Sequence, residues 1–150
     1  MGYDLYMANS ESDEGYFRAN IWTMGILRQV LHGLDLLTDE EPPADATDEA
    51  MTDFEGSGRG IPHCKLSSND GWFVTPAECR AVADGISAKK NQVEPLVAAA
   101  LVDYAEYEAK FNKTTVKPVT NTMARDWSET VFAFGDYCAR AAAKGGFRVF

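Results

Sequence analysis

The sequence has few of the features that mark membrane, exported or metal-binding proteins. It contains no run of about 18 apolar residues, the length that a transmembrane helix needs. The first residues, Met1 to Asp4, lack the basic and apolar regions of a signal peptide. We therefore expect a cytoplasmic protein that makes no contact with a membrane.

Cysteine and histidine are scarce, with three and two residues respectively. An odd number of cysteines without an export signal favours free thiols. Zinc sites usually show C-x2–4-C or H-x3–5-H spacing. Here the nearest pair is His63-Cys64, and adjacent residues on a strand point to opposite sides. The sequence therefore predicts no metal site and no cofactor.

Basic clusters and catalytic motifs are missing as well. The 14 Lys and Arg residues are spread thinly, and only Lys89-Lys90 are adjacent, which argues against direct nucleic-acid binding. There is no G-x-S-x-G, Walker A or G-x-G-x-x-G motif. If the protein is a small enzyme, its nucleophile and base would be Cys64 with His63 or His32. This enzyme is kept as an alternative to a non-enzymatic function.

Negative charge is concentrated in one segment. The net charge is −9, and residues 39–55 contain no Lys or Arg. The acidic residues of this segment are Asp39, Glu40, Glu41, Asp45, Asp48, Glu49, Asp53 and Glu55. They carry all but one unit of the net charge, so the rest of the chain is nearly neutral.

This acidic segment lies in a predicted long loop over residues 38–60, marked by Pro42-Pro43 and by glycines 56, 58 and 60. A short helix near 48–54 is an option within it. The segment is either a solvated insertion or a surface for a basic protein partner. If it is a surface, its deletion should remove partner binding and leave the melting transition unchanged.

Apolar periodicity predicts a single α+β domain over residues 1–150, with the loop at about 38–60 as an insertion. Three to four helices pack on a small, mostly antiparallel sheet, which the two terminal strands and a central hairpin form. Thr75-Pro76-Ala77-Glu78 has the pattern of a capping box, and Gly145-Gly146 that of a helix end. The predicted strands are 3–7, 61–66, 72–74 and 147–150, and the predicted helices are 16–37, 76–87, 92–111 and 122–143.

Aromatic residues fall into two groups. Trp22, Tyr104, Trp127 and Phe134 recur at helical spacing, so we expect them in the core. Tyr16, Arg18 and Trp72 stand where loops meet regular elements, and binding residues often occupy such places. These three join the acidic residues as candidate interaction residues.

Three stretches carry a resemblance: Met1-Gly-Tyr-Asp-Leu-Tyr6, residues 15–22 and residues 69–79. They resemble small uncharacterised proteins of phages and actinobacteria that share an MG-x-D-x-Y start. The resemblance covers at most the first 87 residues and implies no catalytic residue. It implies a phage or mobile-element accessory protein, placed in the host cytoplasm or the virion.

We therefore favour a non-enzymatic accessory protein that binds another protein. Its acidic loop would contact a basic surface of that partner. The first alternative is a virion or assembly component that associates with copies of itself. The second is the small Cys/His enzyme described above.

Overall fold

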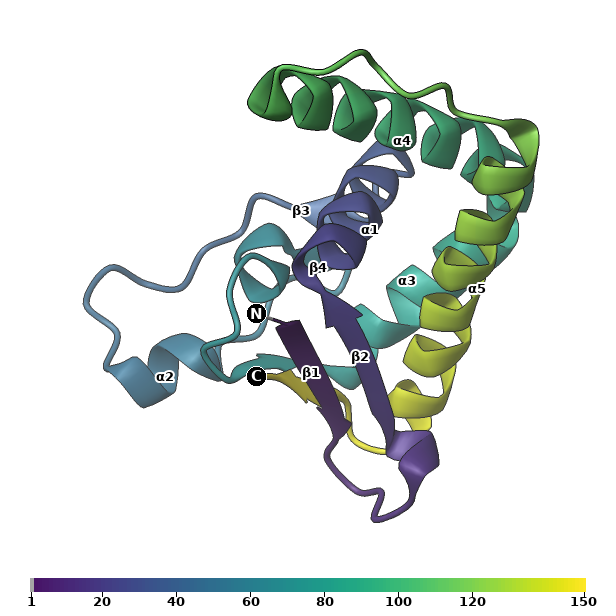
Figure 1. The fold of residues 1–150 in the computed structure, drawn as a ribbon. Helices are drawn as coiled ribbons and strands as arrows, with labels where there is room; N and C mark the ends of the chain where they lie inside the picture. Colours follow the sequence, from purple (N-terminus) through teal and green to yellow (C-terminus); the bar gives the residue numbers. More distant parts are fainter. Residues whose placement is uncertain (1) are drawn as a thin grey trace.

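A four-stranded antiparallel sheet organises the chain, of which the computed structural model describes residues 2–150 (Figure 1). The strand order is β2-β1-β6-β5. The strands are β1 (Gly2–Met7), β2 (Tyr16–Asn20), β5 (Trp72–Val74) and β6 (Phe147–Val149). The predicted α+β class is confirmed, and so is the pairing of the two terminal strands, β1 and β6.

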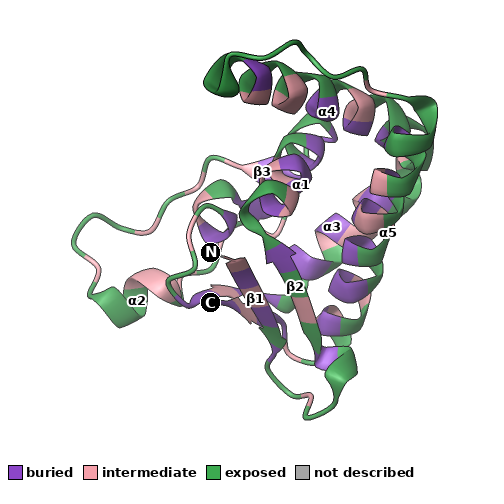
Figure 2. Ribbon diagram, in the orientation of Figure 1, coloured by how far each residue is buried: buried purple, intermediate pink, exposed green. Residues whose placement is uncertain are grey.

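The alternation in β1 explains its place in the sheet. Tyr3, Leu5 and Met7 are buried, whereas Asp4 and Tyr6 lie on the opposite face. Successive side chains of a strand point to opposite faces, so every second residue enters the core. Figure 2 shows the buried residues gathered on the inner sides of the strands and helices.

Helices and short elements complete the fold. They are η1 (Asp13–Gly15), α1 (Ile21–Gly33), β3 (Leu37–Thr38), α2 (Asp48–Thr52), β4 (Ile61–Pro62), η2 (His63–Leu66), α3 (Pro76–Ala88), α4 (Lys90–Asn112) and α5 (Asn121–Ala143). The predicted capping box of α3 is confirmed: Glu78 N donates to Thr75 Oγ1, and Thr75 N donates to Glu78 Oε2. Within residues 2–150, none of the helices is long and apolar enough for a bilayer crossing.

The first helix is shorter than the predicted 16–37. Residues Tyr16–Asn20 form strand β2 and pair with β1, with Phe17 opposite Leu5 and Ala19 opposite Tyr3. The helix begins only after Asn20, whose side chain accepts a hydrogen bond from Thr23 N at 2.8 Å. Pairing across the sheet therefore overrides the helical spacing of this stretch.

The predicted hairpin between 61–66 and 72–74 is wrong, although its second arm does join the sheet. Ile61 and Pro62 pair in parallel with β3, and η2 follows at once. Proline has no N–H for a ladder, so it ends the extended stretch. β5 pairs with β6 instead, and the hairpin of the sheet is formed by β1 and β2.

Candidate interaction surface

The acidic segment, residues 39–55, leaves the body after β3, extends to one side and turns back toward the body through α2 (Figure 1). Seven of its eight acidic residues are exposed, and only Glu40 is partly buried. Figure 2 shows the segment mostly as exposed chain, with partly buried stretches and no fully buried residue. Residues 39–47 and 53–55 form neither helix nor strand, and the short helix is present at Asp48–Thr52.

The Glu40 carboxylate connects the two ends of this loop. It accepts hydrogen bonds from Thr38 Oγ1 at 2.7 Å, before the loop, and from Ser57 N at 2.8 Å, after it. The bond from Thr38 is the main cause of a lowered pKa for the Glu40 carboxyl. Because folding favours the ionised form of Glu40, these hydrogen bonds stabilise the fold at pH values above the ordinary pKa of a glutamate carboxyl. That contribution is lost as the pH falls through the lowered pKa.

A buried ion pair fixes the other end of the segment. Lys65 and Glu78 have fully buried side chains, and Lys65 Nζ lies 2.9 Å from Glu78 Oε1. The same ammonium donates to Phe54 O at 2.6 Å and lies 4.6 Å from the centre of the Phe54 ring. Glu78 Oε1 also accepts from Gly56 N at 3.0 Å. The end of the acidic segment is therefore tied directly to the first turn of α3.

The short helix α2 adds a further attachment. Thr47 Oγ1 caps it by accepting from Ala50 N, and Met51 and Phe54 pack against the core. Asp53 Oδ1 lies 2.7 Å from a guanidinium nitrogen of Arg148 on β6. The segment is thus held at both ends, while the carboxylates between the two attachments face solvent.

Two other candidates, Tyr16 and Arg18, lie on the outer face of the sheet. Both contact Asp4: Tyr16 Oη donates to its carboxylate at 2.5 Å, and Arg18 Nε lies 3.7 Å away. The hydrogen bond to Asp4 is the main cause of a raised pKa for Tyr16. In register, Tyr6 stands between Tyr16 and Arg148, and Arg148 contacts Asp53. The outer face and the acidic segment therefore adjoin.

Trp72 is a core residue rather than a surface one. Only 7% of it is exposed, and its indole N–H donates to Ser68 Oγ at 2.8 Å. Its ring meets the edge of the Phe54 ring, with centroids 6.3 Å apart. Trp72 therefore supports the attachment of the acidic segment from inside the core, which corrects its prediction as an interaction residue.

The three cysteines of residues 2–150 are free thiols, as predicted. Cys64 Sγ contacts the backbone oxygen of Glu40, whereas His63 Nδ1 lies 3.0 Å from Ser67 Oγ. Burial raises the pKa of the Cys64 thiol, so little thiolate forms at neutral pH. This geometry gives no support to a thiol–imidazole pair. Within the described residues, no group of three or more His, Cys, Asp or Glu is placed to hold a metal ion.

Thiol reactivity should follow burial. Cys79 and Cys138 are fully buried, and burial raises the pKa of the Cys138 thiol well above its ordinary value. We expect both to resist a thiol-specific dye in the native protein, with Cys64 reacting slowly. All three should react in denaturant. A fast reaction of native Cys64 would contradict this and restore the enzyme alternative.

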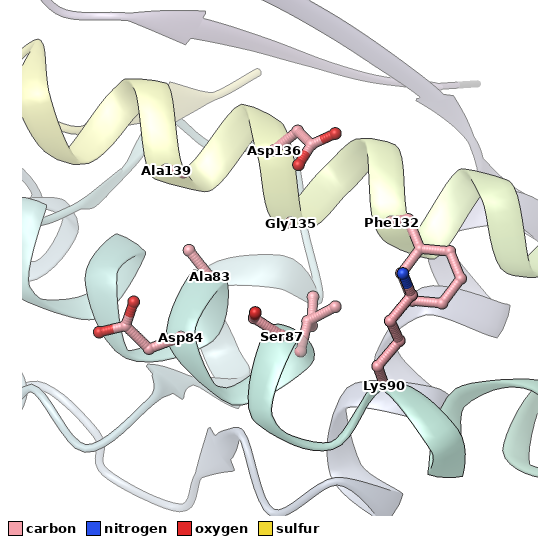
Figure 3. Close-up of a pocket in the computed structure, with 9 residues that line it drawn as sticks. Ala83, Asp84, Ser87, Lys90, Phe132, Gly135, Asp136 and Ala139 are labelled. Carbon is pink, nitrogen blue, oxygen red and sulfur yellow. The ribbon is translucent and has the colours of Figure 1, made fainter.

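A groove of about 500 Å³ lies between α3 and α5 (Figure 3). Asp84 and Asp136 stand on its two sides, and Lys90 Nζ lies 5.6 Å from the centre of the Phe132 ring. Gly135 lies in its floor, where a Cβ would come within 3.2 Å of Ile86. Both carboxylates are exposed, whereas general acid–base chemistry needs a carboxylate held in place, so the groove carries no functional proposal.

Comparisons with known proteins identify no family for this chain. No family model, no curated protein and no solved structure matches the chain. The candidate interaction surface is the attached, solvent-facing acidic segment together with the sheet face beside it.

Proposed function

We propose that this chain is a non-enzymatic accessory protein of a phage or mobile element that binds a protein partner through the acidic segment. The partner presents a basic surface. The carrying observation is that the segment is attached at both ends by Glu40, Asp53 and the Lys65–Glu78 pair, and yet exposes its other carboxylates.

Attachment matters because a flexible loop loses conformational entropy when a partner orders it. A segment that is already held in place loses less, so more of the charge attraction appears as affinity. Opposite potentials also speed the encounter of two proteins, and salt screens that effect. The proposal therefore requires binding that weakens as the ionic strength rises.

Neutralising four of the exposed carboxylates should weaken this binding without loosening the fold. The variant E41Q/D45N/D48N/E49Q leaves the attachments at Glu40 and Asp53 untouched. We expect at least a roughly tenfold loss of affinity for the partner, since each exposed charge pair contributes up to about 1 kcal/mol. The partner is first captured from cells that contain the protein, and its affinity is then measured by calorimetry at low and high salt.

A matched control removes the same charge elsewhere. Four exposed acidic residues on α4 and α5 form no ion pair within residues 2–150: Glu94, Asp126, Glu129 and Asp136. Their conversion to the amides should reduce affinity by less than about threefold, by long-range screening alone. Equal losses in the two variants would show that only net charge matters, and unchanged affinity in the first would refute the proposal.

The structure also changes the simplest test. Deletion of residues 39–55 would remove Glu40, Asp53 and Phe54, each of which contacts the body. We therefore expect this deletion to lower the melting temperature, and not to leave it unchanged as the sequence alone suggested. The E41Q/D45N/D48N/E49Q variant, which keeps these contacts, is the cleaner experiment.

A further inference from the structure

An aromatic groove lies between α1 and α4, away from the acidic segment. It has a volume of about 430 Å³ and is lined by Trp22 of α1 and by Tyr104, Tyr107, Glu108, Phe111 and Asn112 of α4. The helical spacing of the α4 residues places them on one face of that helix. Trp22, at the start of α1, closes the groove from the other side.

The groove corrects the predicted core position of Trp22. This residue is 48% exposed, Tyr107 is 59% exposed and Phe111 is 76% exposed, whereas Phe134 is buried as predicted. Tyr104 is half-buried and meets Trp22 with ring centroids 5.0 Å apart. Helical spacing predicts which residues share a face of a helix, but it does not predict whether another element covers that face. Contiguous exposed aromatic rings of this kind mark interaction sites.

The rings and the charge of the groove favour a planar cation. The Tyr107 and Phe111 rings are nearly parallel, at 16°, with centroids 6.3 Å apart. Aromatic faces attract cations, and a guanidinium also stacks on them. Among the described lining residues, Glu108 is the one charged group, and none is basic. Burial, and after it the charge of Glu108, raises the pKa of Tyr104.

We propose that this groove binds the guanidinium of an arginine side chain, with the ring faces below it and the Glu108 carboxylate beside it. The arginine belongs to the basic partner, so this inference rests on the proposed function for the identity of that partner. Arginine suits the site better than lysine because its planar, delocalised cation both stacks on rings and pairs with a carboxylate.

The test uses a short peptide rather than the partner. Acetyl-Gly-Gly-Arg-Gly-Gly-amide is titrated into ¹⁵N-labelled protein, and the indole N–H of Trp22 and the backbone amides of 104–112 are followed by NMR. We expect saturable shifts at these positions. The same peptide with citrulline, which keeps the shape but lacks the charge, should bind at least about fivefold more weakly. The lysine peptide should bind more weakly than the arginine peptide.

Two variants separate the groove from general charge. Glu108→Gln should weaken the arginine peptide about three- to tenfold, and Glu106→Gln, an exposed carboxylate outside the groove lining, less than about twofold. Equal binding of the citrulline peptide, or equal effects of the two variants, would overturn the proposal. Concentration-dependent dimers whose interface shifts map to Trp22 would overturn it too, in favour of a second copy as the occupant.

Failure of this inference is distinguishable from failure of the proposed function. The E41Q/D45N/D48N/E49Q variant should bind the arginine peptide like the wild type, because its changes lie outside the groove. Peptide shifts at residues 41–49 instead of at Trp22 would overturn the groove and support the acidic segment. If the arginine peptide binds at the groove, and the E41Q/D45N/D48N/E49Q variant keeps its affinity for the partner, the groove is supported and the role of the acidic segment is refuted.

Discussion

Replacing Lys65 with methionine is expected to lower the free energy of unfolding by about 3–5 kcal/mol. The change leaves the Glu78 carboxylate buried without its cation, and it leaves Phe54 O without its donor. Breaking a buried pair from one side costs far more than the pair's net contribution, because the remaining charge cannot reach water. The loss is measured by urea unfolding at neutral pH, with the m-value as the check on two-state behaviour.

Two controls make this result specific. Lys110→Met removes an exposed lysine near the end of α4 and should change the free energy of unfolding by less than about 0.5 kcal/mol. The double variant K65M/E78Q keeps an oxygen acceptor for Thr75 N and removes both charges. It should recover a large part of the loss. A K65M variant as stable as K110M would show that the buried pair does not hold the fold together.

The same substitution tests how the fold supports the candidate surface. Lys65 and Glu78 hold Phe54 and Gly56 at the end of the acidic segment, so the K65M variant should loosen that end first. Hydrogen exchange of the Gly56 amide, which donates to Glu78, reports this directly. Stability and interaction are therefore linked: the pair that anchors the first turn of α3 also positions the carboxylates proposed to meet a partner.

Local signals account for the parts of the fold that were predicted correctly. The capping box satisfies the N–H groups of Thr75 and Glu78 within the helix start itself, so it does not depend on where that helix packs. The alternation in residues 3–7 and 147–149 predicted strands with one apolar face each. Two such strands at the ends of one chain had few other partners, which made their pairing predictable.

The errors arose where a distant partner decides the structure. Tyr16–Asn20 has helical spacing, but β1 lies beside it and turns it into a strand. Trp22 is 48% exposed because α4 covers it only in part, through Tyr104. Composition alone predicted the acidic segment, yet its attachment depends on Lys65, a lysine that nothing in the sequence distinguishes from exposed ones. Lysine is almost never fully buried unless it is paired, so only the fold reveals it.

Replacing Gly146 with alanine is expected to lower the free energy of unfolding by about 3–5 kcal/mol. Gly146 has φ +84°, and an added Cβ would lie 2.2 Å from the backbone oxygen of Val74. The left-handed conformation costs about 1–2 kcal/mol for a residue with a Cβ. The clash adds to this, because relieving it means moving β5 away from β6, where Val74 pairs with Phe147.

Gly145 provides the matched control for this prediction, because it has φ +86° in the same helix end. Its added Cβ would meet the side-chain nitrogen of Asn9, which can swing aside. Gly145→Ala should therefore cost only the conformational part, about 1–2 kcal/mol. Thermal and urea unfolding of the two variants measure the difference. Equal losses would mean that the close approach of Gly146 to β5 does not constrain the junction between α5 and the sheet.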